Sequence, residues 1–245
     1  MSSFADWLQL LGYLFLVLAA LFALFQLLPA PEEEQTASGL KPGRRRRRRG
    51  QKKHRTPLDW ARADDEAEGY APGHAERVAR LSVHLATALG LPDELKQRLE
   101  LAALLHDVGE IDFAPQLLQR PGPLSQAELF ELWQHPVLGA KRALELTESQ
   151  AVSQWVRWHH ERWDGLGYPD GLTGAQIPLP ARILRLADTA DAMLHPRPYR
   201  AAFAPEEVAA EINRLAGVAY DPALTQIFLD DVLPVHLSEQ EGPWR

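Results

Sequence analysis

Cysteine is absent from the 245 residues of this sequence. Its absence excludes disulfide bonds, thiolate metal ligands and cysteine nucleophiles. The sequence also lacks short internal repeats and any alternating apolar and polar pattern longer than a few residues. Strands usually show that alternation, so we expect an all-α fold and not a repeat array.

Lysine and arginine are missing from residues 1–40, which contain four acidic residues. Residues 41–55 then contain ten basic residues and no acidic one, whereas residues 56–245 contain 16 basic and 29 acidic residues. The larger part of the chain is therefore acidic. The net negative charge of this part repels a polyanionic substrate, so such a substrate would need positive charge close to it from metal ions and a few arginines.

Residues 7–31 carry no charged side chain over 25 positions and consist mostly of Leu, Ala and Phe. About 20 apolar residues suffice to cross a bilayer as a helix. A signal peptide is the alternative, but no positive charge precedes the run and the basic cluster follows it. The positive-inside rule places that cluster in the cytoplasm. We therefore expect a single-pass anchor at residues 1–31 in an inner or plasma membrane, with the rest of the chain cytoplasmic.

Residues 32–57 are predicted to be a disordered linker, because they contain too few apolar residues to form a core. A run of six arginines begins at Arg44 and ends at Arg49. Beside a membrane each basic side chain contributes about 1 kcal/mol of attraction to anionic lipid. A topology signal and nucleic-acid binding are the alternatives, but we expect no nucleic-acid polymer as a partner. Ala19 and Ala23 have a spacing that would support a homodimer of the anchor helices.

Apolar residues recur at helical spacing from about residue 70 onward. Val78, Leu81 and Leu85 mark the first helix, which we expect to end at Gly90. His74 lies four residues before Val78 and shares its face. A second helix should start near residue 92 and carry position 106 on its buried face. Further helices are expected from the capping-box signature at 125–128 to residue 132, and over 151–160, 179–194, 205–215 and 222–233, with an ordered loop at 165–180.

Five of the nine histidines form an ordered series with two aspartates. Clustered imidazoles and carboxylates suit one or two divalent transition metals. Such metals generate hydroxide from water at neutral pH and neutralise phosphate oxygens, so the series points to hydrolysis of a phosphate ester. Its members are His74, His106, Asp107, His135, His159, His160 and Asp188.

Four sequence segments around these residues support the prediction of a metal site: HDVGE (106–110), HHERWDGLGYPDGLTG (159–174), ARILRLADTADAM (181–193) and RPYR (197–200). In this order they closely resemble the HD-GYP family, a branch of the HD phosphohydrolase superfamily, from about residue 70 to about residue 230. A lone His-Asp dyad would be weak evidence, whereas the long double-histidine motif is specific. The resemblance implies an HD-type helical bundle, which we expect over residues 58–233, with a C-terminal tail at 234–245.

The resemblance also implies two metals, iron or manganese by family habit. His106 and Asp107 would be ligands at the catalytic centre, with Asp107 able to bridge both ions. The remaining ligands would be His74 and Asp188 for one ion, and His135, His159 and His160 for the other.

The implied reaction is hydrolysis of cyclic di-GMP to pGpG or GMP by a hydroxide held between the metals. In the family the loop with Gly167, Tyr168 and Pro169 borders the substrate pocket. Arg197 and Arg200 would hold phosphate oxygens, since guanidinium groups make bidentate contacts with phosphate. Surface ion pairing is the alternative for Arg200.

The sequence departs from the family at two positions. Glu110 replaces a lysine that supplies positive charge near the substrate phosphate, so it would weaken anion binding or add a carboxylate to a metal. Tyr70 replaces a glutamate with which some members bind a third metal. The alternatives are therefore a catalytically weak cyclic-dinucleotide receptor, or an HD phosphohydrolase acting on another nucleotide. Asp164, Asp191 and Arg182 are interpreted as loop or helix supports, Arg182 alternatively as a phosphate contact.

Overall fold

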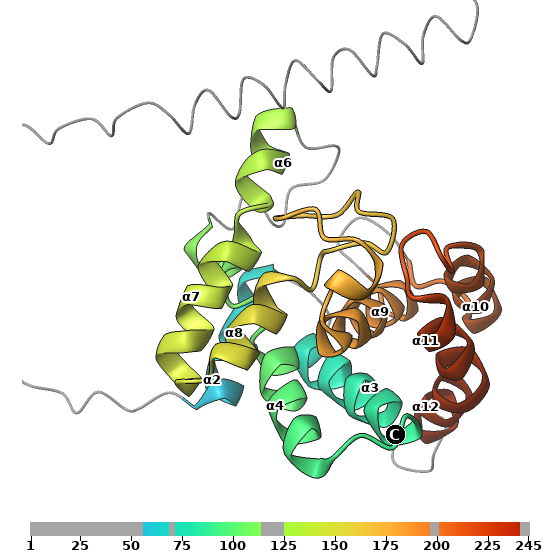
Figure 1. The fold of residues 1–245 in the computed structure, drawn as a ribbon. Helices are drawn as coiled ribbons and strands as arrows, with labels where there is room; N and C mark the ends of the chain where they lie inside the picture. The colour runs from blue at the N-terminus through green and yellow to red at the C-terminus, as the bar shows by residue number, and fades with distance from the viewer. Residues whose placement is uncertain (1–55, 69–71, 114–124, 197–200, 241–245) are drawn as a thin grey trace, which may run out of the picture. The chain divides into compact units, whose positions relative to one another are not determined.

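The computed structural model describes residues 56–68, 72–113, 125–196 and 201–240. The chain divides into two units, Met1–Gln51 and Lys52–Arg245, and every described residue belongs to the second. The described residues form helices and no strand (Figure 1), apart from one isolated bridge between Ala216 and Tyr220. The α-helices are α2 Pro57–Glu68, α3 His74–Ala88, α4 Asp93–Leu104, α6 Gln126–Leu132, α7 His135–Thr147, α8 Gln150–Arg157, α9 Leu179–Leu194, α10 Pro205–Arg214, α11 Pro222–Ile227 and α12 Leu233–Gln240.

Three shorter helical segments join these helices. Glu110–Asp112 and Gly174–Gln176 are 3₁₀ turns, and Phe228–Val232 is a π-helical segment between α11 and α12. Within the described ranges, none of the helices has the length and apolar character needed to cross a bilayer. The anchor predicted at 1–31 lies outside those ranges.

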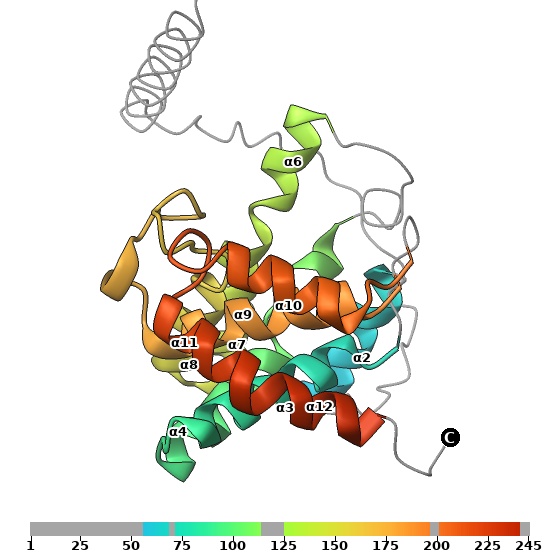
Figure 2. The ribbon, with the colours of Figure 1, turned by 90° about the vertical axis from the view of Figure 1, so that its right-hand side faces the viewer.

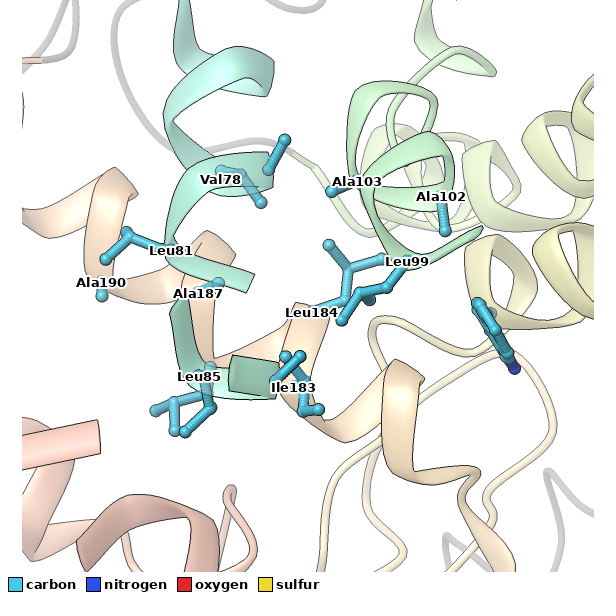
Figure 3. Packing of buried hydrophobic residues seen from close by; sticks show 14 of the residues in the cluster. Val78, Leu81, Leu85, Leu99, Ala102, Ala103, Ile183, Leu184, Ala187 and Ala190 are labelled. Atoms are coloured by element: carbon cyan, nitrogen blue, oxygen red, sulfur yellow. The ribbon is translucent and has the colours of Figure 1, made fainter. Parts of the chain in front are cut away.

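The core is built on α3, which packs against α4 on one side and α9 on another. Figure 3 shows apolar side chains of these three helices facing one another. Val78, Leu81 and Leu85, which predicted the first helix, are fully buried, as are Leu99 of α4 and Leu184 of α9. Burying one leucine contributes about 1.5–3 kcal/mol. This packing holds together three of the elements that carry the predicted ligands.

The other helices surround this core. α7 pairs with α8, and α8 packs on α4 and α9. α10 packs on α9, while α11 and the π-helical segment pack on α3, and Figure 2 shows α10, α11 and α12 grouped together. α2 contacts α3, α4 and the turn Glu110–Asp112. The described helices therefore bring residues from both ends of the domain to α3.

The start of α3 is held by a carboxylate from the preceding helix. Asp65 accepts hydrogen bonds from the backbone N–H groups of Gly73 at 2.8 Å and Ala75 at 3.3 Å. Gly73 has φ 83°, a left-handed conformation that glycine adopts at little cost. These contacts fix the first turn of α3, and His74 is its first residue.

Some helix bounds agree with the sequence and others do not. α9 has the predicted bounds, and the predicted capping box starts α6, with Ser125 Oγ accepting from Glu128 N at 3.3 Å. The helix expected to end at Leu233 instead continues to Gln240. Leu233 and His236 are buried there, so the apolar stripe continues past the expected end. Residues 234–240 therefore belong to the folded domain and not to a tail.

Candidate metal centre

Three of the predicted ligand histidines share one local construction. His106 follows α4, His135 follows α6, and His159 follows α8, which ends at Arg157 and not at 160 as expected. Each ring places Nδ1 at 2.7–2.8 Å from the carbonyl oxygen three residues earlier, which belongs to Ala103, Leu132 or Val156. A carbonyl only accepts, so Nδ1 carries a proton and Nε2 is the nitrogen left to bind a metal.

His74 is oriented by a carboxylate instead of a carbonyl. Its Nδ1 lies 2.7 Å from Asp191 Oδ2, and Arg77 donates to both oxygens of Asp191 at 2.7 and 3.0 Å. Burial raises the pKa of Asp191, but hydrogen bonds with His195, His74 and Arg77 outweigh burial and hold that pKa well below its usual value. Asp191 therefore stays ionised. We expected only a helix support at this position, and the structure makes it the partner of a predicted ligand.

Asp107 lies between two pairs of imidazoles. Its Oδ2 is 2.9 Å from Nε2 of His106 and 4.0 Å from Nε2 of His74. Its Oδ1 is 3.4 Å from Nε2 of both His135 and His159. One carboxylate therefore presents one oxygen to each pair, which is the geometry of a ligand shared by two cations.

Two groups of side chains result, and Asp107 belongs to both. In each group the ligand atoms lie within 4.8 Å of one another. Asp188 stands beside the first group, with Oδ1 at 3.6 Å from His74 Nε2 and 3.8 Å from His106 Nε2. The groups are His74, His106 and Asp107, and Asp107, His135, His159 and His160.

The donor atoms of these groups fit a divalent metal. Nε2 of His106, His135 and His159 and Oδ1 of Asp107 are buried and make no hydrogen bond within the described ranges. Buried polar atoms without a hydrogen bond usually have another partner, such as an ion. Imidazole and carboxylate suit the divalent transition metals. The site therefore has the composition and the available lone pairs of a metal centre.

Negative charge dominates the site. Burial lowers the pKa of His106, but the carboxylates of Asp107 and Asp188 outweigh it and raise that pKa to about 10. Burial and repulsion by Asp107 raise the pKa of Glu110 to about 7. Burial and repulsion by Asp107 and Glu110 also raise the pKa of Asp64, which α2 brings to the site. Protons compensate the excess negative charge here, and divalent cations would do the same.

Glu110 lies behind a predicted ligand. Its Oε1 is 3.5 Å from His135 Nδ1, the nitrogen on the side of the ring away from Nε2. The carboxylate is buried and is not a member of either group. Glu110 therefore adds negative charge beside the site, where the family usually has a lysine.

His160 has a different hydrogen-bond partner from the other histidines of the site. Its Nδ1 lies 2.7 Å from Nη1 of Arg185 in α9. Arginine only donates, so Nδ1 accepts, and a neutral ring then carries its proton on Nε2. Burial and the nearby His159, His135 and Arg185 hold the pKa of His160 well below its usual value, which keeps the ring neutral.

The loop after the double histidine closes over His160. An added Cβ at Gly167 would lie 2.3 Å from Arg162 N and 2.6 Å from His160 O, so only glycine allows this approach. Tyr168 N donates to His160 O at 3.3 Å, and the two rings stack with centroids 4.8 Å apart. Trp133 stacks with Tyr168 at 5.3 Å. Pro169 follows through a cis peptide bond.

Two carboxylates hold this loop in place through hydrogen bonds. Glu161 is buried and accepts from the backbone N–H groups of Asp170 at 2.7 Å and Leu172 at 3.0 Å. Asp170 in turn accepts from Arg157 and from Trp158 Nε1, each at 2.7 Å. Residues 165–178 therefore form the ordered loop that the sequence predicted over 165–180, and α9 begins at Leu179.

The remaining predicted residues divide into two sets. Arg197 and Arg200 lie outside the described residues, as does Tyr70. Arg182 is paired with Asp221, and its guanidinium carbon lies 5.6 Å from the centroid of the Trp163 ring. That pairing assigns Arg182 a structural role. Asp164 pairs with Arg162 at 2.7 Å and supports the loop, as expected.

Sequence reasoning missed Asp64, Trp133 and Arg185. Arg185 precedes Asp188 by three residues on the same helix, and this spacing was a usable signal that both share a face. Asp64 carried no comparable signal, because it reaches the site only through the packing of α2. Trp133 gave no signal either, because its stacking partner Tyr168 is far away in the sequence.

Asp191→Asn should weaken metal binding about 10–100-fold, the usual effect of losing a residue that orients a ligand. Asparagine can still accept from His74 but has lost the charge that Arg77 and His195 compensate. Competition with a chelator would measure the change, with Asp164→Asn as the matched control. An unchanged metal affinity would show that His74 does not depend on this carboxylate.

Helices around paired histidine and aspartate groups place the protein in the HD-domain class. The family model described as an HD domain matches residues 64–224, which is more than half of the chain. Together with the double-histidine motif and the Gly167-Tyr168-Pro169 loop, this match shows that the chain belongs to the HD-GYP family.

Known relatives agree with this family. The chain is 40% identical over 136 residues to 3'3'-cGAMP-specific phosphodiesterase 1 of Vibrio cholerae, covering 55% of this chain and 31% of the relative. It is 38% identical over 159 residues to a cyclic di-GMP phosphodiesterase of Thermotoga maritima, covering 64% of this chain and 43% of the relative. The chain thus spans less than half the length of these curated relatives.

A solved structure of a cyclic GMP-AMP specific phosphodiesterase from V. cholerae is also similar. It superposes with a TM-score of 0.62 at 26% identity, covering 76% of this chain and 50% of the other. The helical arrangement described above is therefore that of a known HD-domain protein.

Proposed function

We propose that this chain is a metal-dependent phosphodiesterase that hydrolyses cyclic di-GMP to pGpG or GMP. The observation that carries the proposal is the sharing of Asp107 by two histidine-containing groups. His74 and His106, with Asp188 beside them, would hold one ion together with Asp107. His135 and His159 would hold the second, joined by His160 once Arg185 releases Nδ1 and the ring proton moves there, which frees the Nε2 lone pair. Two relatives are named as phosphodiesterases of cyclic dinucleotides, which supports this substrate class for the chain.

Bound divalent ions, iron or manganese by family habit, would neutralise phosphate oxygens and lower the pKa of water enough to supply a nucleophile. The side chains of this protein supply position and shape. The Nδ1 contacts of His74, His106, His135 and His159 fix the direction of each ligand lone pair. Tyr168 covers one face of His160 and would limit the access of water from that side.

A second candidate substrate is 3'3'-cGAMP. The relative at 40% identity carries that specificity in its name. Cyclic di-GMP and 3'3'-cGAMP present the same phosphodiester linkages to the metal groups and differ in one base, so Asp107 and its neighbours do not discriminate between them. Both substrates are therefore tested together.

The test uses the purified full chain, stripped of metal and reconstituted with ferrous iron under anaerobic conditions or with manganese. Each cyclic dinucleotide is then incubated with each form, and products are separated by chromatography. We expect a linear dinucleotide to appear only in the metal-loaded forms. Dinucleotide binding without turnover, despite bound metal, would favour the receptor alternative, to which Glu110 points. The absence of both would direct the search to other nucleotides.

We also propose that residues 1–31 anchor the chain in an inner or plasma membrane and that the arginines from Arg44 to Arg49 contact anionic lipid. The uncharged stretch at 7–31 and the basic residues after it support this. The full chain should stay in the membrane fraction after an alkaline wash, whereas a chain lacking residues 1–31 should not. Release of the full chain by the wash would contradict the anchor.

A further inference from the structure

Arg185 is a cation at the metal centre without an acidic partner. In the described part of the chain its hydrogen-bond partner is His160 and not a carboxylate, and its Nε is buried without a hydrogen bond. Several other arginines of the domain have such partners, among them Arg62 with Glu76, Arg77 with Asp191, Arg157 with Asp170, Arg162 with Asp164, and Arg182 with Asp221. Keeping a partly buried guanidinium unpaired is costly, so an anion is the expected partner.

Arg185 contacts one of the two ligand groups of the metal centre. Its Nη1 lies 2.7 Å from His160 Nδ1, and His160 belongs to the group that contains Asp107. Arg185 also lies close enough to Tyr168 to lower the pKa of its hydroxyl, although burial is the larger effect and raises that pKa. The guanidinium thus lies beside one of the ligand groups and beside the loop after the double histidine.

The charge of the site explains why such a cation is useful. Glu110 is acidic where the family usually has a lysine, and it is buried beside His135. A phosphodiester anion would therefore meet less positive charge on that side. Arg185 has five N–H donors and a planar shape that matches two phosphate oxygens, and one hydrogen bond to His160 leaves most of these donors available.

We propose that Arg185 binds a non-bridging phosphate oxygen of the substrate and supplies the positive charge that Glu110 does not. The proposal rests on the phosphodiesterase function proposed above. It assigns the anion contact to α9, the helix that also carries Asp188. Arg185 is then a substrate-binding residue of the proposed phosphodiesterase.

The test compares Arg185→Gln and Arg185→Lys with the wild type, all as metal-loaded full chains. Arg214→Gln is the matched control, because Arg214 is exposed and pairs with Glu211 at 2.6 Å. Three quantities are measured: metal ions bound per chain, the affinity for inorganic phosphate by calorimetry, and kcat and KM for both cyclic dinucleotides. Circular dichroism checks that each variant is folded.

We expect Arg185→Gln to weaken phosphate binding about 10–100-fold and to raise KM by a similar factor, with metal content unchanged. Arg185→Lys should recover part of the loss, because it keeps the charge but not the planar fork. Phosphate affinity and KM equal to wild type would overturn the proposal. A parallel loss of metal in both variants would also overturn it, since Arg185 would then act by positioning His160.

The same measurements separate this proposal from the proposed function. If the wild type converts neither dinucleotide but Arg185→Gln still weakens phosphate binding, the phosphodiesterase function fails while the anion contact stands. If the wild type converts a dinucleotide and Arg185→Gln behaves like Arg214→Gln, the function stands and the assignment of Arg185 fails.

Discussion

Replacing Asp107 with asparagine should abolish metal-dependent turnover and leave fewer metal ions bound per chain. Asparagine preserves the shape of the side chain but removes the negative charge that faces His106 and His74 through Oδ2, and His135 and His159 through Oδ1. Loss of a residue that only orients a ligand costs about 10–100-fold. Loss of a ligand shared by both groups should exceed that range. Metal analysis and turnover of the full chain measure the two effects.

The matched control is Asp230→Asn, an exposed aspartate that accepts a hydrogen bond from Gln226 at 2.7 Å. It makes the same chemical change away from the site and should behave like the wild type. Full metal content and turnover in Asp107→Asn would show that the two groups do not share this carboxylate, and the proposed metal centre would be wrong.

Replacing Gly109 with alanine should destabilise the protein by about 3 kcal/mol or more, in the range of severe overpacking. The backbone of Gly109 has an ordinary φ of -74°, so the effect is steric and not conformational. An added Cβ would lie 2.1 Å from His135 O and 2.7 Å from Gly139 N, where α7 passes the HDVGE motif. Backbone atoms cannot yield without moving His135, so metal binding should fall as well. Denaturant unfolding of the full chain, monitored on the helical signal, measures the stability change.

Gly90→Ala is the matched control for this prediction. Gly90 has φ +65° and nothing within 4 Å of an added Cβ, so only conformational strain is introduced. That strain costs about 1 kcal/mol. Equal destabilisation by the two variants would show that the contact between Gly109 and His135 does not constrain the fold.

The helices of the core could be predicted because local patterns determine them. Val78, Leu81 and Leu85 recur at the helical period, and burial of that face on α4 and α9 follows from the same pattern. The capping box at Ser125 predicted the start of α6. The end of the last helix was not predicted in this way, and Leu233 and His236 are buried where the helix continues to Gln240.

The candidate ligands were identified from the motifs, and their arrangement required the fold. The sequence carries the histidines, the His106-Asp107 dyad and the Gly167-Tyr168-Pro169 loop. Spacing along the chain does not tell which oxygen of Asp107 faces which imidazole. That division arises because α3, α4, α7 and α8 converge on one point.

Sequence alone therefore determined the helical class, most of the helix positions and the chemical nature of the site, since these depend on residue type and short-range periodicity. Tertiary structure decided the partners of those residues: Asp191 for His74, Arg185 for His160, and Asp64 beside Glu110. The physical reason is that such contacts join residues distant in sequence. Their geometry is set by how whole helices pack and not by any local pattern.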